Sequence, residues 1–400
     1  MNPAVAERKP KILIVTGVLW VGGGAEKVAA NLGNYLVDEG YETHLLTFYE
    51  DDNKYPFRGT YYTLNEKPPR SRLYKIWGIP LRVWRIARYI KKHDIDMAVS
   101  FLEEANFYTL VAKLLFVRRL PVVVSVRNNI NKRGWLFKIL TKHLYPYAKR
   151  VVSVTKAIEE ILKKEYHLTN TTTIYNPIDT ELVKKKTAEP LPTEWQWLKD
   201  RSYVAISIGR LTHQKGQWHL IRAFSEVVKK FPEAILVIVG EGEYREKLLK
   251  LISDSGLTDN VFLAGKHNNV YPFLATADVF VFSSLYEGMP NTMLEAYSVG
   301  LPIISPDCVS GPREIIAPDL KIDEDIEYPH STKYGMLIQP MENEEIWKPV
   351  QDVLLTKAEE ELAQQIYERL TESAIKPETQ TLISSFEIKP INQQWERLIM

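Results

Sequence analysis

The sequence has a single cysteine, Cys308, among its 400 residues. One cysteine excludes a disulfide within the chain and a zinc site built from cysteines. Chains without disulfides are typical of reducing compartments, so we expect a cytosolic protein. The eight histidines are scattered without metal-ligand spacing. Asp94 and Asp96 have the spacing of a metal-binding pair, but they precede a strand-like run instead of following one, so we expect no metal.

Long apolar runs are also missing. No stretch reaches the roughly 18 apolar residues that a membrane-spanning helix needs. The first ten residues are polar and charged, lead directly into a strand-like run and lack the apolar core of a signal peptide. We therefore expect a protein that is neither secreted nor integral to a membrane.

Acidic residues are scarce in parts of the first half. Residues 1–175 hold 28 Lys and Arg against 16 Asp and Glu, a net charge of +12, whereas the whole chain has a net charge of +1. The remainder is therefore acidic, with a net charge of −11. A basic half favours an anionic partner, such as a membrane surface, a lipid diphosphate or nucleic acid.

The length predicts two domains, and both halves alternate strand-like runs with helical segments. This alternation is typical of doubly wound parallel sheets, so the predicted fold class is α/β with two Rossmann-like domains. The predicted boundaries are a first domain at 1–179, a linker at 180–201, a second domain at 202–381 and a C-terminal helical segment at 382–400 that packs back on the first domain. The predicted strands lie at residues 11–16, 42–48, 97–101, 121–127, 150–155, 172–175, 203–208, 234–239, 260–263, 279–282, 301–305 and 335–338.

The most informative stretch is residues 283–296. Its pattern predicts a turn after a buried strand and then a helix that begins near Asn291. Free N–H groups at such a helix start attract an anion. Glu287 and Glu295 bracket this position, where carboxylates would accept hydrogen bonds from hydroxyl groups beside a phosphate. The pattern fits a sugar nucleotide. The further residues predicted to line it are Gly288, Met289, Pro290 and Thr292.

Three other loops follow predicted strands. Gly209 precedes Arg210 and Lys215, whose cationic groups would neutralise the charge that builds on a leaving diphosphate. Gly240 and Glu241 come after the next strand, where glycines permit a close approach of a base or ribose. In the first half, the run of residues 22–26 contains Gly23 and Gly24 after the first strand, without a Walker or Gly-x-Gly-x-x-Gly signature.

Together, these glycine loops, Arg210, Lys215 and the Glu287 to Glu295 spacing resemble the retaining nucleotide-sugar glycosyltransferases of glycosyltransferase family four. The resemblance extends over nearly the whole chain. It implies the GT-B fold, with two Rossmann-like domains facing each other across a cleft, and catalysis without a metal or cofactor. It further implies that Glu287 contacts the donor sugar, Glu295 the ribose, and Arg210 with Lys215 the diphosphate, while Gly23 and Gly24 approach the phosphate.

The sequence departs from that family at the loop after the predicted strand 97–101. Many family members have a histidine there, and this chain has none. The contact to the donor sugar would come from Glu103, Glu104, Asn106 or backbone groups. We choose Asn106 as the catalytic candidate, because a buried carboxylate would need a partner. Arg127 and Asn128, after the next strand, are further candidates for the acceptor site.

Residues 67–92 hold nine Lys and Arg and no acidic residue, interleaved with apolar side chains. The positions 73, 77, 80, 84 and 87 form a stripe at helical spacing, which Gly78 and Pro80 are expected to divide into two pieces. A basic segment with tryptophans fits a membrane interface, and the alternative is that the stripe packs on the sheet. The predicted acceptor or membrane contacts are Arg82, Trp84, Arg85 and, in a second basic segment, Trp135.

The sequence therefore predicts a retaining glycosyltransferase at the cytoplasmic face of a membrane. It would move a hexose or N-acetylhexosamine from a nucleotide donor, UDP-linked by preference, to a polyprenyl-linked or cell-surface glycan. The alternatives are a phosphorylase or nucleotide-sugar epimerase on the same plan, or a non-catalytic sugar-nucleotide-binding membrane subunit. Nucleic-acid binding is not expected, because no recognition module is visible.

Overall fold

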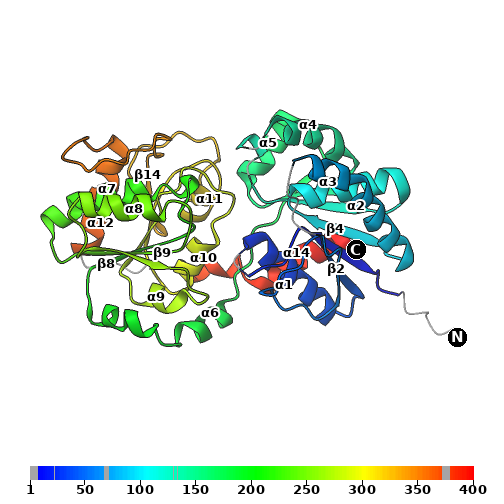
Figure 1. Ribbon diagram of the computed structural model, residues 1–400, viewed down its shortest axis with the longest axis horizontal. Helices are drawn as coiled ribbons and strands as arrows, with labels where there is room; N and C mark the ends of the chain where they lie inside the picture. Colours follow the sequence, from blue (N-terminus) through cyan, green and yellow to red (C-terminus); the bar gives the residue numbers. More distant parts are fainter. Residues whose placement is uncertain (1–7, 22, 67–71, 129, 133, 372–378) are drawn as a thin grey trace. The chain divides into compact units, whose positions relative to one another are not determined.

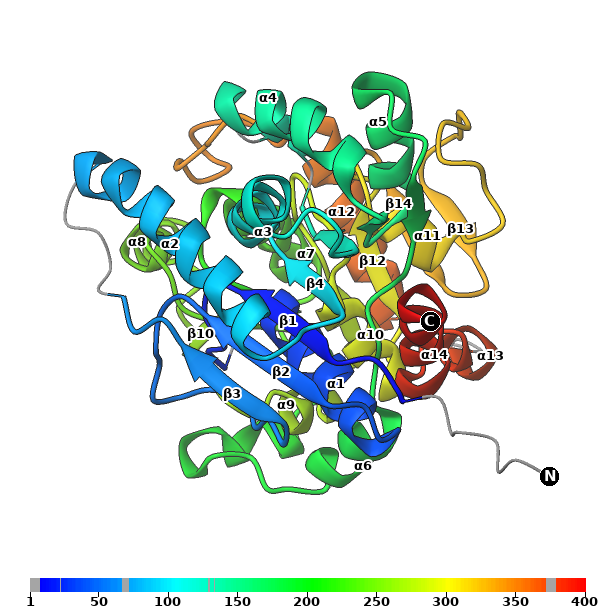
Figure 2. The same ribbon diagram turned by 90° about the vertical axis from the view of Figure 1, so that its right-hand side faces the viewer.

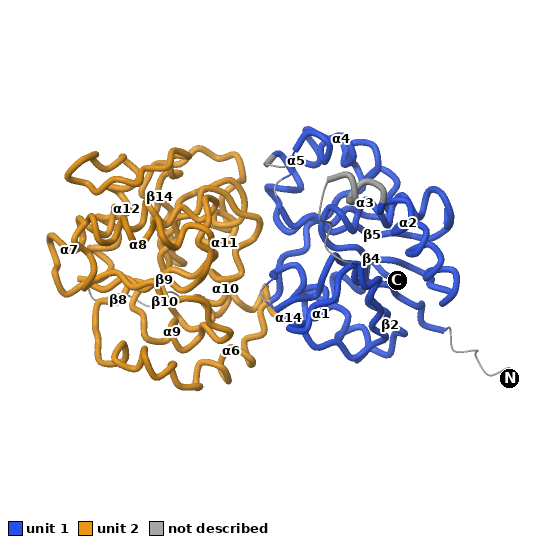
Figure 3. Tube along the Cα trace, viewed as in Figure 1, with its two compact units in different colours: residues 1–177, 388–400 blue, residues 178–387 orange. Residues whose placement is uncertain are grey.

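The structure is a computed structural model that describes residues 8–21, 23–66, 72–128, 130–132, 134–371 and 379–400. The chain forms two compact units (Figure 3). Unit 1 comprises residues 1–177 and 388–400, and unit 2 comprises residues 178–387. Among the described helices, none combines the length and apolar character needed to span a bilayer.

Unit 1 is built on a seven-stranded sheet in the order β3-β2-β1-β4-β5-β6-β7, with every neighbouring pair parallel. Its inner strands are runs of Val, Ile and Leu buried on both faces, as parallel sheets require. The strands are β1 (Ile12–Thr16), β2 (Thr43–Thr47), β3 (Thr60–Thr63), β4 (Met97–Phe101), β5 (Val122–Val126), β6 (Arg150–Ser153) and β7 (Thr171–Thr173). The pattern of the sequence did not predict β3.

Helices cover both faces of this sheet. The helices α2 (Arg72–Lys92), α3 (Glu103–Phe116) and α4 (Trp135–Leu144) lie on one face, and α1 (Gly24–Asp38) lies on the other (Figure 2). A further helix, α5 (Lys156–Tyr166), connects β6 to β7. The C-terminal helix α14 (Ile388–Ile399) belongs to unit 1, where Ile391 and Trp395 are fully buried in the core beside α1.

Helix α2 corrects two expectations. It is continuous through Pro80, because one missing N–H removes one bond from a long helix that packs along α3. Its buried face agrees with the predicted stripe only in part: Ala87 of the stripe is buried together with Val83, Ile86 and Ile90, whereas Trp84 is 44% exposed. The side chains of residues 72–77 lie outside the described part, so positions 73 and 77 of the stripe are not assigned.

Unit 2 repeats the plan with strand order β10-β9-β8-β11-β12-β14-β13, in which only the pair β13 and β14 is antiparallel among the described strands. Helices α7, α8 and α12 lie on one face, and α6, α9 and α10 on the other (Figure 1). The strands are β8 (Val204–Ile208), β9 (Ile235–Val239), β10 (Val261–Gly265), β11 (Val279–Val281), β12 (Ile303–Pro306), β13 (His330–Thr332) and β14 (Gly335–Ile338). The helices are α6 (Thr180–Thr187), α7 (Gln217–Lys230), α8 (Arg245–Asp254), α9 (Tyr271–Ala275), α10 (Asn291–Ser298), α11 (Pro312–Ile316), α12 (Lys357–Thr371) and α13 (Thr379–Ser384).

The boundaries of the two units differ from the domain boundaries predicted from the sequence. Residues 180–201 are not an extended linker, since they form α6 and a 3-10 helix (Thr193–Asp200) within unit 2. Asp179 caps α6, and Val183 and Leu198 are buried. The C-terminal segment is divided, because α13 belongs to unit 2 and only α14 returns to unit 1.

Candidate functional site

Four loops meet at the carboxyl edge of the unit 2 sheet, which we call the unit 2 edge: residues 209–216, 240–244, 282–290 and 307–311. The backbone amide of Leu211 donates to the carbonyl of Glu241, and that of Leu285 donates to Gln214. Parallel strands bring their carboxyl ends to one side of a sheet, which is where ligands of such folds bind. The sequence-predicted loops of the second half are therefore brought together.

Two glycines of the unit 2 edge allow neighbouring loops to pack backbone against backbone. Gly240 has a φ of +155°, and a Cβ there would lie 1.9 Å from the carbonyl oxygen of Gly209. A Cβ at Gly216, with a φ of +57°, would lie 2.3 Å from the carbonyl oxygen of Ser283. Both positions need glycine because neighbouring backbone fills the space of a side chain. Loop packing thus accounts for the glycine at position 240, and its contact with a donor base or ribose stays a prediction.

Lys215 and Glu287 form an ion pair at this edge. The Nζ of Lys215 lies 2.7 Å from Oε1 of Glu287, and the two side chains are 15% and 7% exposed. Gln214 supports the carboxylate, because its Nε2 donates to the carbonyl of Tyr286 at 2.9 Å and lies 3.4 Å from Oε2 of Glu287. A nearly buried pair of this kind needs such additional hydrogen bonds to offset desolvation. The charge of Lys215 is therefore already balanced inside the protein.

Arg210 differs from Lys215. Its side chain is exposed, and within the described ranges its guanidinium has no hydrogen-bond or ion-pair partner. Its position is fixed through the backbone, since Nε2 of Gln217 donates to the carbonyl of Arg210 at 2.9 Å. Arg210 is thus a cation held at the edge by its main chain and available to an anion from solution.

Helix α10 begins at this edge without a side-chain cap. Pro290 occupies the N-cap position with φ −77° and ψ 103°, and Asn291 and Thr292 form the first turn. The first N–H groups of a helix attract anions when no side chain satisfies them. Gly288 and the buried Met289 come directly before this turn, as the sequence predicts.

Glu295 lies one turn into α10 and is 9% exposed. The hydroxyl of Tyr271, on α9, donates to Oε1 of Glu295 at 3.3 Å. Tyr271 and Gln214 are site residues that the sequence analysis missed. Gln214 directly precedes Lys215 in the loop of residues 209–216, so its position in the sequence could have indicated it. Nothing in the sequence indicates that Tyr271 contacts Glu295. The remaining predicted residue, Glu241, is exposed and lies 3.4 Å from Nη1 of Arg245.

In unit 1, the glycine loop after β1 is occupied by a side chain. Gly23 is the N-cap of α1, and a Cβ at this position would lie 2.1 Å from Oε2 of Glu26. Glu26 is buried and folds back over the helix start, where a carboxylate interacts favourably with the helix dipole. The carboxylate of Glu26 thus takes the space beside Gly23, where a phosphate was predicted to approach, and Gly24 begins α1. Gly22 lies outside the described residues.

Asn106 has an internal role, which corrects its choice as a catalytic residue. It is fully buried, its Oδ1 accepts from Ser100 at 2.8 Å, and its Nδ2 donates to the carbonyl of Ser125 and the hydroxyl of Tyr145. These bonds join β4, β5 and the turn after α4. The loop has another unusual feature, because Leu102 has a φ of +73°, a conformation that is rare for a bulky residue.

Arg127 is buried at the carboxyl end of β5. Its Nη2 donates to Oδ1 of Asn176, and its Nη1 lies 3.5 Å from Oγ of Ser125. Burial lowers the pKa of Arg127 to about 9, although the nearby charge of Glu26 opposes this. Asn128, the next predicted residue, is half-buried. Arg127 and Glu26 therefore place opposite charges at the carboxyl edge of the unit 1 sheet.

The predicted membrane contacts divide into buried and exposed groups. Arg82 is 5% exposed, its Nε donates to Glu66 at 2.9 Å, and its guanidinium lies over the ring of Phe48. This burial contradicts a surface role for Arg82. Arg85 donates to the carbonyl of Leu64 and keeps part of its side chain in solvent. Trp84 and Trp135 are 44% and 72% exposed, so they remain candidates for a surface contact.

No group of three or more His, Cys, Asp or Glu side chains suited to a metal ion occurs among the residues that the structure describes.

Two family models match the chain. The model described as Glycosyl transferases group 1 matches residues 193–370, and the model described as Glycosyltransferase Family 4 matches residues 22–182. An uncharacterized glycosyltransferase of Methanocaldococcus jannaschii is 33% identical over 98% of both chains. The N-acetylgalactosamine-N,N'-diacetylbacillosaminyl-diphospho-undecaprenol 4-alpha-N-acetylgalactosaminyltransferase of Campylobacter jejuni is 29% identical over 74% of this chain and 81% of its own length.

Solved structures share the fold at low sequence identity. The Anabaena protein HepE, in complex with UDP and glucose, is similar with a TM-score of 0.74, 19% identity and coverage of 97% of this chain and 98% of the other. The lipopolysaccharide outer core galactosyltransferase WaaB in its apo form is similar with a TM-score of 0.69 and 18% identity, and covers 97% and 99% of the two chains. These similarities confirm the predicted pair of Rossmann-like sheets of the GT-B type.

Proposed function

Because the chain belongs to the GT-B glycosyltransferases of group 1, we propose that it transfers a sugar from a UDP-linked donor to a lipid-linked glycan with retention at the anomeric carbon. The observation that carries this proposal is the unit 2 edge. There, the exposed cation of Arg210 and the paired cation of Lys215 lie beside the uncapped start of α10. A diphosphate is the ligand that best matches this set of donors.

The ion pair between Lys215 and Glu287 suggests how the donor is held. An arriving diphosphate would take part of the interaction with Nζ of Lys215, which is 2.7 Å from Glu287 before the donor binds. Glu287 would then accept a hydrogen bond from a hydroxyl of the donor sugar. Glu295, oriented by Tyr271, would accept from the ribose. The two carboxylates thus serve hydroxyl groups, and the cations serve the diphosphate.

The reaction breaks the bond between the anomeric carbon and the diphosphate oxygen and forms a bond from that carbon to the acceptor oxygen. In the proposed mechanism the acceptor attacks from the face that the diphosphate leaves, and the leaving oxygen takes the acceptor proton. Arg210 and Lys215 stabilise the charge that develops on the leaving group, a type of contribution worth several kcal/mol in enzymes, on the order of 3 kcal/mol per donor. No metal is needed in this proposal, because these cations fill that electrostatic role.

The substrates are proposed from relatives. HepE, which shares the fold, was solved with UDP and glucose, and this supports a uridine donor carrying a hexose or N-acetylhexosamine. The Campylobacter relative is named for an undecaprenyl-diphosphate-linked acceptor, which supports a polyprenyl-linked or surface glycan. Such acceptors reside in a membrane, so we propose peripheral association at the cytoplasmic face, with the exposed Trp135 as one contact.

The test is a thermal-shift screen of UDP-sugars, followed by incubation of the best donor with membrane extract. Wild-type protein is expected to release UDP and label a lipid-extractable product. The Arg210→Ala, Lys215→Ala double variant is expected to lower turnover by at least about 100-fold. Circular dichroism and a melting curve serve as the folding control. Wild-type turnover in the double variant would overturn the proposed roles.

A further inference from the structure

A groove of about 510 Å³ lies on the outer side of unit 1 between α2 and the edge strand β3. Its wall on α2 is formed chiefly by Trp84, Arg85, Arg88 and Lys92, and Tyr62 of β3 closes the other side. Lys92 and Arg88 lie in the last turns of the helix, and neither was singled out as a site residue by the sequence. The groove is therefore a feature of the folded unit.

The charge of this groove is of one sign. None of the described residues that line it is acidic, and residues 67–93 contain no Asp or Glu at all. Arg85 is tied to the carbonyl of Leu64 at 2.7 Å and lies 3.7 Å from Glu66. By contrast, Arg88 and Lys92 have no ion-pair partner among the residues described. Cations that converge without a counter-charge favour an anionic ligand.

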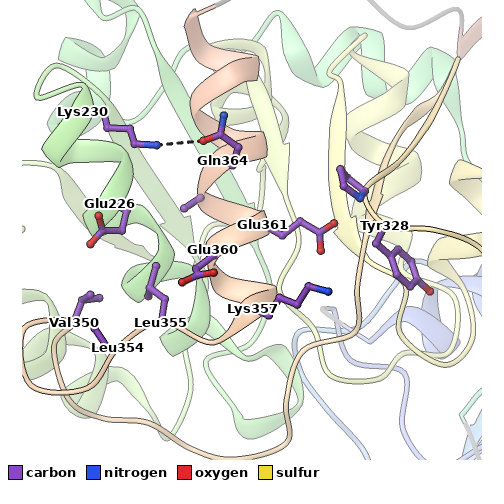
Figure 4. Close-up of a pocket in the computed structure, with 12 residues that line it drawn as sticks. Glu226, Lys230, Tyr328, Val350, Leu354, Leu355, Lys357, Glu360, Glu361 and Gln364 are labelled. Atoms are coloured by element: carbon purple, nitrogen blue, oxygen red, sulfur yellow. Dashed lines mark hydrogen bonds between the residues drawn. The ribbon is translucent and has the colours of Figure 1, made fainter.

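A groove in unit 2 shows that this pattern is not general. It has a volume of about 720 Å³ and lies beside α7 and α12 (Figure 4). Its cations Lys230 and Lys357 are accompanied by the carboxylates Glu226, Glu360 and Glu361, and Lys230 donates to Gln364. Its three carboxylates outnumber its two cations, so it offers no comparable attraction for an anion.

The rim of the α2 groove is apolar and exposed. Leu81 is 56% exposed and Trp84 44% exposed, and the guanidinium of Arg88 lies 5.2 Å from the centroid of the Trp84 ring. On the same face of the sheet, α4 exposes Trp135 by 72% and Leu136 by 50%. Cations combined with exposed aromatic and aliphatic side chains are characteristic of surfaces that sit at the headgroup level of a bilayer. A soluble phosphate would not require this apolar rim.

We propose that the α2 groove binds the phosphate of anionic phospholipid headgroups and thereby docks unit 1 on an anionic leaflet. This proposal rests on the proposed membrane-bound acceptor and assigns the surface that meets the membrane. Arg88 and Lys92 supply the charge, and Leu81 and Trp84 contact the upper part of the acyl region. Arg82 takes no part, because Glu66 holds it inside the unit.

The test is co-sedimentation of the full chain with vesicles of phosphatidylcholine alone and of phosphatidylcholine mixed with phosphatidylglycerol. We expect wild-type protein to bind the mixed vesicles and to be released by salt. Arg88→Gln with Lys92→Gln should lower the partition coefficient about 30-fold, the effect expected when two cations are removed from an anionic surface. Lys163→Gln with Lys164→Gln, on α5 of the same unit, removes equal charge elsewhere and should change binding less than about 3-fold.

Three outcomes would overturn the proposal. The first is that wild-type protein does not bind the mixed vesicles, and the second is that both double variants lose the same amount of binding. The third is that inorganic phosphate releases the protein from the vesicles when a chloride salt of the same ionic strength does not. The last outcome would indicate a soluble phosphate ligand. Thermal shift by UDP separates this result from the proposed function. UDP should stabilise wild type and the Arg88→Gln, Lys92→Gln variant equally, and absence of a UDP shift in wild type would contradict the donor site alone.

Discussion

The two units share a fold but place their cations differently. In unit 2, Lys215, Arg222 and Arg313 are each paired with a carboxylate, at 2.7 Å to Glu287, 3.0 Å to Glu359 and 3.1 Å from Nε to Asp307. In unit 1, helix α2 instead presents Arg88 and Lys92 beside the exposed Trp84, and α4 exposes Trp135. The same doubly wound scaffold thus holds a site with fixed charges in one unit and a cationic surface in the other.

The buried network of Glu359 provides the largest expected effect on stability. Glu359 is fully buried and accepts from Nδ1 of His219 at 2.7 Å and from Nε of Arg222 at 3.0 Å. Glu359→Ala would leave the guanidinium buried without its partner and is expected to lower the free energy of unfolding by about 3–5 kcal/mol. Urea unfolding measures this loss. Glu226→Ala, at a more exposed pair with Lys229, should change it by less than about 1 kcal/mol.

Two arginines of α2 allow a buried, paired cation to be compared with an exposed cation within unit 1. Arg82 is paired with Glu66 inside the unit, whereas Arg88 faces the groove. Arg82→Met is expected to cost about 3 kcal/mol of unfolding free energy, because Glu66 loses its buried partner. Arg88→Met should cost less than about 0.5 kcal/mol and still weaken vesicle binding. Similar losses of stability in the two variants would refute this division of α2.

The pair of Lys215 and Glu287 can be examined by a double-mutant cycle. Each single alanine variant leaves one charge nearly buried without its partner, while the double variant removes both. We expect a coupling free energy for unfolding of about 1–3 kcal/mol, so the double variant is more stable than the sum of the single effects predicts. Sugar transfer, in contrast, should stay low in all three variants. Strict additivity in unfolding would show that the pair does not interact.

The smallest expected effect concerns pH. Although burial opposes it, the hydrogen bonds from His219 and Arg222 hold the pKa of Glu359 below its ordinary value of 4.5. A lowered pKa in the folded state adds stability above the unfolded pKa, and this stability is lost as pH falls through the folded value. The unfolding free energy of Glu359→Gln should therefore decline less steeply than that of wild type below pH 4.5. Parallel pH profiles would contradict the assignment.

The sequence predicts the fold well because alternation of buried strands and helices is a local signal. It also predicts that Arg210, Lys215, Glu287 and Glu295 lie at one edge of a sheet, since each follows a strand end or a helix start, and the structure places them there. Their contacts with a donor stay a prediction. It could not show that Glu26 fills the space beside Gly23, because this depends on a side-chain conformation. The prediction of which face of α2 is buried failed for a related reason. A periodicity argument places the charged Arg82 in solvent, but Arg82 lies on the buried face, where it forms an ion pair with Glu66.

Asn106 shows the same limit in unit 1. Its neighbours in the sequence suggested a ligand contact, but its amide is used by Ser100, Ser125 and Tyr145, which come from three different segments. Residues distant in sequence decide whether a polar side chain is available. The pairing of Tyr271 with Glu295 was missed for this reason as well.

The most direct test of the central claim is calorimetric titration of UDP into wild-type protein and into the Arg210→Ala, Lys215→Ala variant. The unit 2 edge predicts that wild type binds UDP and that the variant, while still folded, binds at least about 30-fold more weakly, as expected when two charge-assisted contacts are removed. Equal affinity in the two proteins would contradict the assignment of the donor diphosphate to this edge.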